Sequence, residues 1–195
     1  MNPFNSAREN SGNKLEQADL AVAGELLPFS ENALVQAIGT VSDLSDQEPL
    51  YAASAAVIGT GVILRDDWTA QTGLRMLAAH LLATGLRGMV KQTVDRTRPD
   101  AAASRGHYEA AIGDRYESDF NSFPSGHTAG AVAVARLVAR RYPNSGLLAL
   151  GLAGASAAAQ VLRSKHYLTD VAAGAAIGWL AEELLHLLLA RAERI

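Results

Sequence analysis

The chain has no cysteine among its 195 residues. This absence excludes disulfide bonds but leaves the redox compartment open, because many exported bacterial proteins also lack cysteine. The five histidines do not form a zinc-binding pattern such as His-Glu-x-x-His, so no metal site is predicted. There is no excess of positive charge either, and the net charge of −3 argues against nucleic acid as the main partner. Residues 1–14 contain no apolar run of the kind that secretory signals carry.

Aromatic residues are also scarce, at 6% of the chain, whereas aliphatic residues are abundant and gather in runs. Because apolar and polar residues rarely alternate, the sequence predicts an all-α bundle of about five to seven helices. A single helical domain is expected over residues 15–195, and the polar segment 1–14 is expected to be flexible or loosely attached. The runs that predict helices are 15–27, 33–41, 50–64, 73–90, 128–138, 142–162 and 171–190.

A first pair of candidate functional residues is Lys91 and Arg98, which lie seven positions apart. If the helix continues through this stretch, both side chains lie on one face, two turns apart. Two cations on one face suit an anionic ligand. The alternative interpretation is a solvated basic end of a helix.

The second motif is Pro124, Ser125, Gly126 and His127, placed directly before an apolar run. Proline and serine are typical of a helix start, so free backbone N–H groups and the positive end of the helix dipole should lie beside the serine hydroxyl. Such a terminus favours phosphate, and Gly126 lets the backbone approach the anion closely. The alternative is an ordinary capped helix that carries a surface histidine.

The third motif is His166, followed four residues later by Asp170. If the helix already includes His166, this spacing sets the carboxylate beside the imidazole, where it fixes the tautomer and makes the other ring nitrogen more basic. Such a histidine is a credible nucleophile. The alternative is that the two residues have no catalytic role and only lie near a helix N-terminus, where an acidic side chain is favourable.

Taken in order, the three motifs resemble the type 2 phosphatidic acid phosphatase superfamily, which also includes class A acid phosphatases and vanadium haloperoxidases. The resemblance covers about residues 87 to 178 and implies the helical fold of that family. It implies that His166 attacks phosphorus to give a phosphohistidine and that Asp170 orients His166. His127 would protonate the leaving oxygen and then activate water. No metal and no cofactor are implied.

The resemblance also implies which groups hold the non-bridging phosphate oxygens: the side chains of Lys91, Arg98 and Ser125 and the backbone N–H of Gly126. The chain departs from the family pattern at one point. Where the family has serine and arginine ahead of the nucleophile, this chain has Ala159 and Gln160. Arg163 follows about one helical turn later, and we expect its long side chain to supply the missing positive charge.

The apolar runs permit a membrane protein without requiring one. A membrane span needs about 20 mainly apolar residues, and the run 142–162 meets that length most clearly. If the helices span, Arg140, Arg141, Arg191 and Arg194 lie at the ends far from the motifs. The positive-inside rule then predicts a multi-pass protein of the bacterial inner membrane with its active site on the non-cytoplasmic face. The alternative is an alanine-rich soluble or peripheral bundle.

Several functions are compatible with these motifs. The favoured one is a phosphatase acting on a phosphomonoester or pyrophosphate of a lipid, such as phosphatidic acid, phosphatidylglycerol phosphate or an isoprenoid pyrophosphate. The alternatives are a soluble non-specific acid phosphatase, a vanadium-dependent haloperoxidase, and a helical protein whose site has decayed. The segment 100–123, of mixed charge, is either a substrate-selecting lid or a solvated loop, and His107 within it receives no catalytic role.

Overall fold

The structure is a computed structural model that describes residues 3–11, 13–115 and 117–194. Apart from one small hairpin these residues are helical, which confirms the expected all-α fold, and they form nine α-helices, more than expected. The helices are α1 (Asn5–Asn10), α2 (Lys14–Leu26), α3 (Ala33–Ser42), α4 (Gln47–Leu64), α5 (Asp67–Lys91), α6 (Pro99–Arg105), α7 (Gly126–Arg141), α8 (Pro143–Leu162) and α9 (Leu168–Ala192). The remaining elements are the 3₁₀ turns η1 (Leu27–Phe29), η2 (Asp43–Ser45) and η3 (Ser118–Phe120) and the strands β1 (Val94–Arg96) and β2 (Ala110–Ile112).

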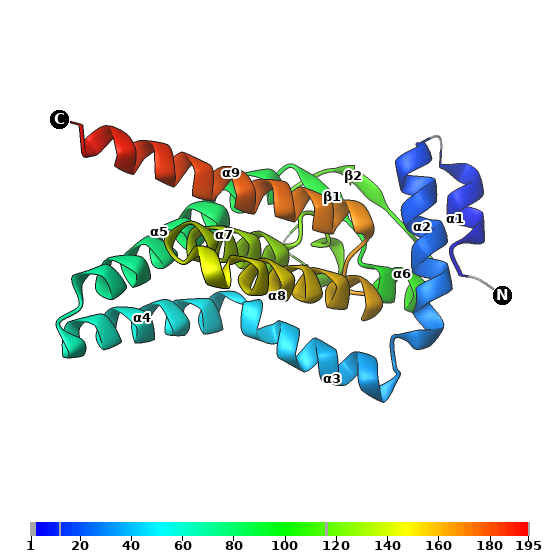
Figure 1. Cartoon of the computed structure of the whole chain (residues 1–195). Helices are drawn as coiled ribbons and strands as arrows, with labels where there is room; N and C mark the ends of the chain where they lie inside the picture. The colour runs from blue at the N-terminus through cyan, green and yellow to red at the C-terminus, as the bar shows by residue number, and fades with distance from the viewer. Residues whose placement is uncertain (1–2, 12, 116, 195) are drawn as a thin grey trace.

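The long helices α4, α5, α7, α8 and α9 form the main bundle (Figure 1). Small residues let α7 and α9 approach each other closely. A Cβ atom added at Gly178 would lie 2.3 Å from the carbonyl oxygen of Ala129, and one at Gly174 would lie 2.5 Å from that of Ser125. The two helices therefore pack backbone against backbone, as small residues allow in membrane bundles. Their N-terminal ends meet, since the Ser125 N–H donates to the Asp170 carbonyl oxygen at 3.0 Å.

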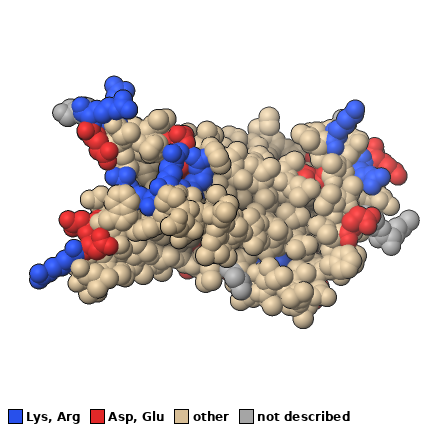
Figure 2. Space-filling model, in the orientation of Figure 1, with Lys and Arg blue, Asp and Glu red and all other residues tan. Residues whose placement is uncertain are grey.

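The outside of the bundle is strongly apolar. Two helices of the described chain, α8 and α9, are long and apolar enough to cross a membrane. Figure 2 shows charged side chains gathered towards the two ends of the molecule, with a broad zone between them that is largely uncharged. Large apolar side chains exposed on these two helices include Leu147, Leu148, Leu152, Leu180, Leu187 and Leu188. The arrangement suits a protein whose middle lies in lipid.

The chain between Lys91 and Arg98 differs from the expectation. Helix α5 ends at Lys91, so the prediction that one helix carries both cations is wrong. Strand β1 follows and pairs antiparallel with β2. Arg98 then has an extended backbone, because the following Pro99 disfavours the helical conformation for the residue before it. The two cations belong to different elements, and the reversal of the chain brings them close enough to interact electrostatically.

The N-terminal segment contains a short helix. Residues 5–10 form α1, and the Phe4 side chain before it is only 2% exposed. Its ring packs in a cluster with Leu20, Ala102 and Tyr167. This aromatic side chain places residues 3–11 beside the residue that follows His166, and the division into a flexible segment 1–14 and a domain 15–195 stays a prediction.

The segment 100–123 is folded in its described part rather than being an extended loop. It contains α6, β2 and η3, and an ion pair joins Arg115 to Glu109 at 2.6 Å. The backbone of Arg96 holds the end of this segment, since the Ser122 N–H donates to the Arg96 carbonyl oxygen at 3.0 Å. The segment thereby positions Ser122, which lies in the candidate site.

Candidate active site

Helix α7 begins where the sequence predicted, with Ser125 as its N-cap. The Ser125 Oγ accepts hydrogen bonds from the Thr128 N–H at 3.5 Å and from the Thr128 hydroxyl at 3.1 Å. The proton of the Ser125 hydroxyl is thus left free to donate to a ligand. Among the described residues, no acceptor meets the backbone N–H of Gly126 or of His127. These donors and the helix dipole make the start of α7 suitable for a phosphate.

His166 lies in the turn before α9. The helix therefore does not include His166, although the spacing argument for Asp170 assumed that it would. Its ring is buried, and Nδ1 lies 2.7 Å from the carbonyl oxygen of Ser122. Because a carbonyl oxygen can only accept, Nδ1 carries the proton and Nε2 keeps its lone pair. Burial lowers the pKa of His166, although the nearby Asp170 carboxylate acts in the opposite direction. The ring is therefore neutral at physiological pH, as a nucleophile requires.

Asp170 lies behind His166, with its Oδ2 at 3.7 Å from Nδ1. This separation is too long for a hydrogen bond, so Asp170 acts on the imidazole mainly through its charge. The Asp170 carboxylate is completely buried and accepts three hydrogen bonds. The donors are the Ser122 hydroxyl at 2.5 Å, the Tyr167 N–H at 2.8 Å and an Arg96 guanidinium nitrogen at 2.6 Å. The carboxylate is thus held in one orientation.

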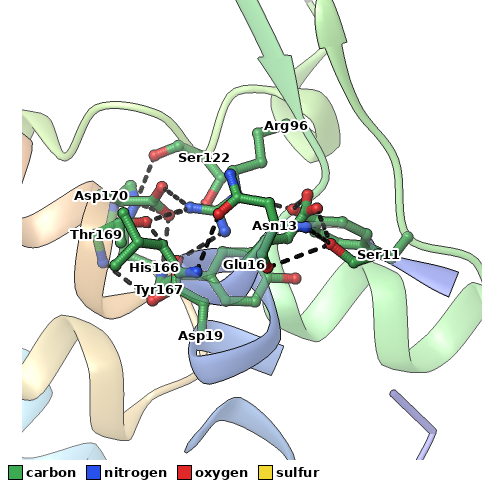
Figure 3. Close-up of polar contacts among 12 residues, drawn as sticks. Ser11, Asn13, Glu16, Asp19, Arg96, Ser122, His166, Tyr167, Thr169 and Asp170 are labelled. Carbon is green, nitrogen blue, oxygen red and sulfur yellow. Dashed lines mark hydrogen bonds and ion pairs between the residues drawn. The ribbon is translucent and has the colours of Figure 1, made fainter. Parts of the chain in front are cut away.

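Arg96 joins Asp170 to a second buried carboxylate. Figure 3 shows its guanidinium between Asp170 and Asp19, and the ion pair with Asp19 measures 2.8 Å. Asp19 also accepts hydrogen bonds from the N–H of Thr169, at 3.1 Å, and from the Thr169 hydroxyl. The guanidinium stacks 4.1 Å above the centre of the Tyr167 ring. Helix α2 is thereby connected to the start of α9 and to the aspartate behind the candidate nucleophile.

His127, the second residue of α7, is partly exposed. Its Nε2 lies 3.9 Å from a carboxylate oxygen of Asp43 and 3.8 Å from one of Asp46. Burial lowers the pKa of His127, and the charges of Asp46 and Asp43 oppose this shift in part by favouring the protonated ring that a general acid needs. His127 and His166 are close enough for their charges to interact, so the second and third motifs meet in one site.

Three cations surround the start of α7. Lys91 lies at the end of α5, and Arg87 lies one turn before it on the same helix. Both interact electrostatically with Arg98. None of the three forms an ion pair within residues 3–11, 13–115 and 117–194, and the buried Nε of Arg98 has no hydrogen-bond partner there. Such a concentration of unpaired positive charge requires an anion.

The family model described as the PAP2 superfamily matches residues 72–194. The chain belongs to the PAP2 superfamily. One solved structure with this fold is the PAP2-type phosphatidylglycerolphosphate phosphatase of Bacillus subtilis, with 18% identity, a TM-score of 0.64 and coverage of 95% of this chain and 90% of that chain. Another is Aquifex aeolicus LpxE, with 16% identity, a TM-score of 0.58 and coverage of 86% and 94% respectively. No curated protein gives a significant match.

The point at which this PAP2 chain departs from the family pattern is well ordered. The Gln160 amide is buried and donates to the Ser42 hydroxyl at 2.9 Å. Arg163, which we expected to replace the family arginine, forms an ion pair with Asp43 at 2.6 Å. Its guanidinium reaches the edge of the site, because Asp43 is also near His127. Its charge, however, is already balanced by a carboxylate.

Sequence reasoning missed four residues around this PAP2 site. Arg87 lies four positions before Lys91, and this helical spacing could have identified it. The other three are Ser122, Arg96 and Asp19, whose neighbours are far away in sequence, and no local pattern marks them. No group of three or more His, Asp or Glu side chains in the described chain is arranged to hold a metal ion.

Proposed function

We propose that this PAP2 protein is a lipid phosphatase that hydrolyses a phosphomonoester or pyrophosphate through a phosphohistidine intermediate. The observation that carries the proposal is the free Nε2 of His166 in the same site as His127 and the unpaired cations. An imidazole with Nδ1 held by a carbonyl group presents its other nitrogen as a nucleophile. The donors at the start of α7 and the cations provide a place for the phosphoryl oxygens.

In the proposed first step, Nε2 of His166 attacks phosphorus while the bond between phosphorus and the leaving oxygen breaks. His127 transfers its proton to that oxygen, so the leaving group departs as an alcohol or as a phosphate. In the second step a water oxygen attacks phosphorus, His127 takes a proton from the water, and the phosphorus–nitrogen bond breaks. Inorganic phosphate is released, and His166 and His127 return to their starting states.

The other site residues stabilise charge during these steps. We propose that Lys91, Arg98, the Ser125 hydroxyl and the Gly126 N–H hold the non-bridging oxygens. Asp170 stabilises the positive charge that develops on His166 as its Nε2 forms a bond to phosphorus. We infer that no metal ion takes part, because these cations and the helix terminus supply the positive charge that a metal ion would otherwise provide.

The proposed substrate is a lipid because of the surface around the site. The apolar helices α8 and α9 fit a bilayer, and the structures with this fold are named for a phosphatidylglycerolphosphate phosphatase and for LpxE. We propose a multi-pass protein of a bacterial inner membrane. The ends of α7 and α9 far from the site carry Arg140, Arg141, Arg191 and Arg194, so the positive-inside rule favours an active site on the non-cytoplasmic face.

Phosphate release by detergent-purified protein tests this proposal. The substrates are phosphatidic acid, phosphatidylglycerol phosphate, an isoprenoid pyrophosphate and a water-soluble aryl phosphate. We expect release from at least one lipid, loss of activity in His166→Ala, and inhibition by vanadate, which resembles the transition state. Equal turnover of the aryl phosphate by protein recovered without detergent would favour a soluble acid phosphatase. Activity that survives His166→Ala would refute the mechanism.

A further inference from the structure

We propose that Arg87 binds the phosphoryl group and supplies the positive charge that the PAP2 pattern places at position 160. The inference rests on the proposed phosphatase function and extends its binding site by one residue. It replaces our expectation that Arg163 takes this role. Three observations support it: the position of the Arg87 guanidinium, its lack of an ion pair, and the ion pair that already balances the charge of Arg163.

The position of the guanidinium is fixed at the start of α7. The Arg87 Nε donates to the carbonyl oxygen of Pro124 at 3.1 Å, so the side chain is held one residue before the N-cap. A Cβ atom added at Gly126 would lie 3.0 Å from the guanidinium carbon and 3.3 Å from one terminal nitrogen. The guanidinium of Arg87 therefore lies against Gly126, whose backbone N–H is free in the described chain. Both kinds of donor can reach the same anion.

Arg87 forms no ion pair with a carboxylate within the described part of the protein. Three other cations near the site do: Arg96 pairs with Asp19 and Asp170, Arg163 with Asp43, and Lys165 with Asp100. Arg87 has no such ion pair: its positive neighbours Lys91 and Arg98 repel it, and the charge of Asp46 attracts it only from beyond ion-pair distance. A partly buried arginine that faces two other cations is costly unless an anion binds between them. A phosphoryl group with two or more negative charges provides that anion.

The alternative cation is less suitable. Arg163 is engaged with Asp43, and its side chain packs so closely on α3 that a Cβ atom added at Gly39 would overlap its Cδ at 2.1 Å. Its positive charge is already balanced by that carboxylate, so Arg163 would add less net attraction for a phosphate than an arginine without an ion pair. Gln160 itself is bound to Ser42 and carries no charge. Of the described arginines near positions 160 and 126, Arg87 is the one already placed beside the phosphate-binding N–H groups.

Four variants test the proposal: Arg87→Ala, Arg87→Lys, Arg87→Gln and, as the matched control, Arg163→Ala. For each we would measure kcat/KM on the best lipid substrate and the inhibition constant of orthovanadate. Arg87→Ala should lower kcat/KM by ~10²-fold to 10³-fold, as the loss of one oxyanion donor does, and should weaken vanadate inhibition in parallel. Arg163→Ala removes the alternative cation, and we expect it to lower kcat/KM and to weaken vanadate inhibition by at least ~10-fold less than Arg87→Ala does.

The lysine and glutamine variants separate charge from structural support. Lysine keeps the charge, whereas glutamine keeps a donor for Pro124 and loses the charge. If Arg87 binds phosphate, lysine should retain more vanadate affinity than glutamine. Glutamine retaining wild-type values would overturn the inference, because it would show that Arg87 only holds Pro124. An active Arg87→Ala combined with an inactive Arg163→Ala would overturn it as well.

These outcomes are distinct from failure of the proposed function. If His166→Ala is inactive and Arg87→Ala is fully active, the phosphatase proposal stands and the role of Arg87 is refuted. If the wild-type protein hydrolyses no substrate, calorimetric binding of orthovanadate to wild type and to Arg87→Gln still tests the inference. Equal affinity, or no binding to either protein, would refute it, and weaker binding to the variant would support it.

Discussion

Replacement of Arg96 by methionine tests the buried ion pairs that Arg96 forms with Asp19 and Asp170 behind His166. The variant leaves two carboxylates, Asp19 and Asp170, without their cation, and their side chains are only 2% and 0% exposed. Breaking a buried ion pair by removing one partner costs about 3–5 kcal/mol, since a buried charge is left unpaired. For a domain of this size, about 2–4 °C of Tm per kcal/mol gives a loss of roughly 6–20 °C.

The assay is apparent Tm in one detergent at one scan rate, measured at pH 8 and at pH 5. The deficit of Arg96→Met relative to wild type should be larger at pH 8, because protonation of the unpaired carboxylates at lower pH removes the uncompensated charge. Adding Asp19→Asn should restore part of the Tm, as it removes one of the two charges. Arg75→Met is the surface control, since its partner Glu193 is exposed, and the exposed pair contributes at most about 1 kcal/mol.

The same variant should lower kcat more than it raises KM, because Arg96 touches the aspartate behind the nucleophile and not the substrate. A Tm within about 2 °C of wild type at pH 8 together with unchanged kcat would refute the reasoning. It would mean that Asp170 does not depend on Arg96 for its orientation or its charge balance.

Three further predictions concern the site itself. Asp170→Asn should lower kcat by only ~10-fold to 10²-fold, because the Ser122 carbonyl still fixes the tautomer of His166. The corresponding substitution in serine proteases lowers kcat by about 10⁴-fold, and a fall of that size here would contradict the prediction. Burial lowers the pKa of His166, so its ring stays neutral below the ordinary pKa of about 6.5. A plot of kcat against pH should therefore stay flat down to a pH below about 6.5. A fall in kcat centred above pH ~7 would contradict this prediction. Gly126→Ala should lower kcat/KM by ~10-fold or more, since its Cβ would lie 3.0 Å from a guanidinium carbon; Gly59→Ala, where a Cβ meets nothing within 4 Å, should leave kcat/KM unchanged.

Features governed by neighbouring residues could be predicted from the sequence. Ser125 caps α7 as expected, because capping depends on a side chain and the backbone two or three residues later. The apolar runs predicted all of the long helices, and the ordered motifs predicted the PAP2 superfamily. The expected roles of the site residues remain predictions, which the variants described above test.

Errors arose where long-range contacts override local spacing. Spacing alone put Lys91 and Arg98 on one helix, but pairing of β1 with β2 ends α5 at Lys91. The i,i+4 argument for His166 and Asp170 likewise depended on a helix that already included His166. In the structure its ring is bound by Ser122, which is 44 positions away, and α9 starts at Leu168. In both cases a contact distant in sequence determined where the helix stops or begins.

The sequence by itself determined the long helices, the capped start of α7 and the family, because each depends on residues adjacent in the chain or on an ordered pattern. Only the tertiary structure decided which charges are balanced. Asp19 and Arg96 are 77 positions apart and Arg163 and Asp43 are 120 apart, and packing of the bundle brings each pair within 3 Å. The same packing leaves Arg87, Lys91 and Arg98 without an ion pair in the described chain. Electrostatic interaction depends on distance in space, and the folded bundle alone sets that distance.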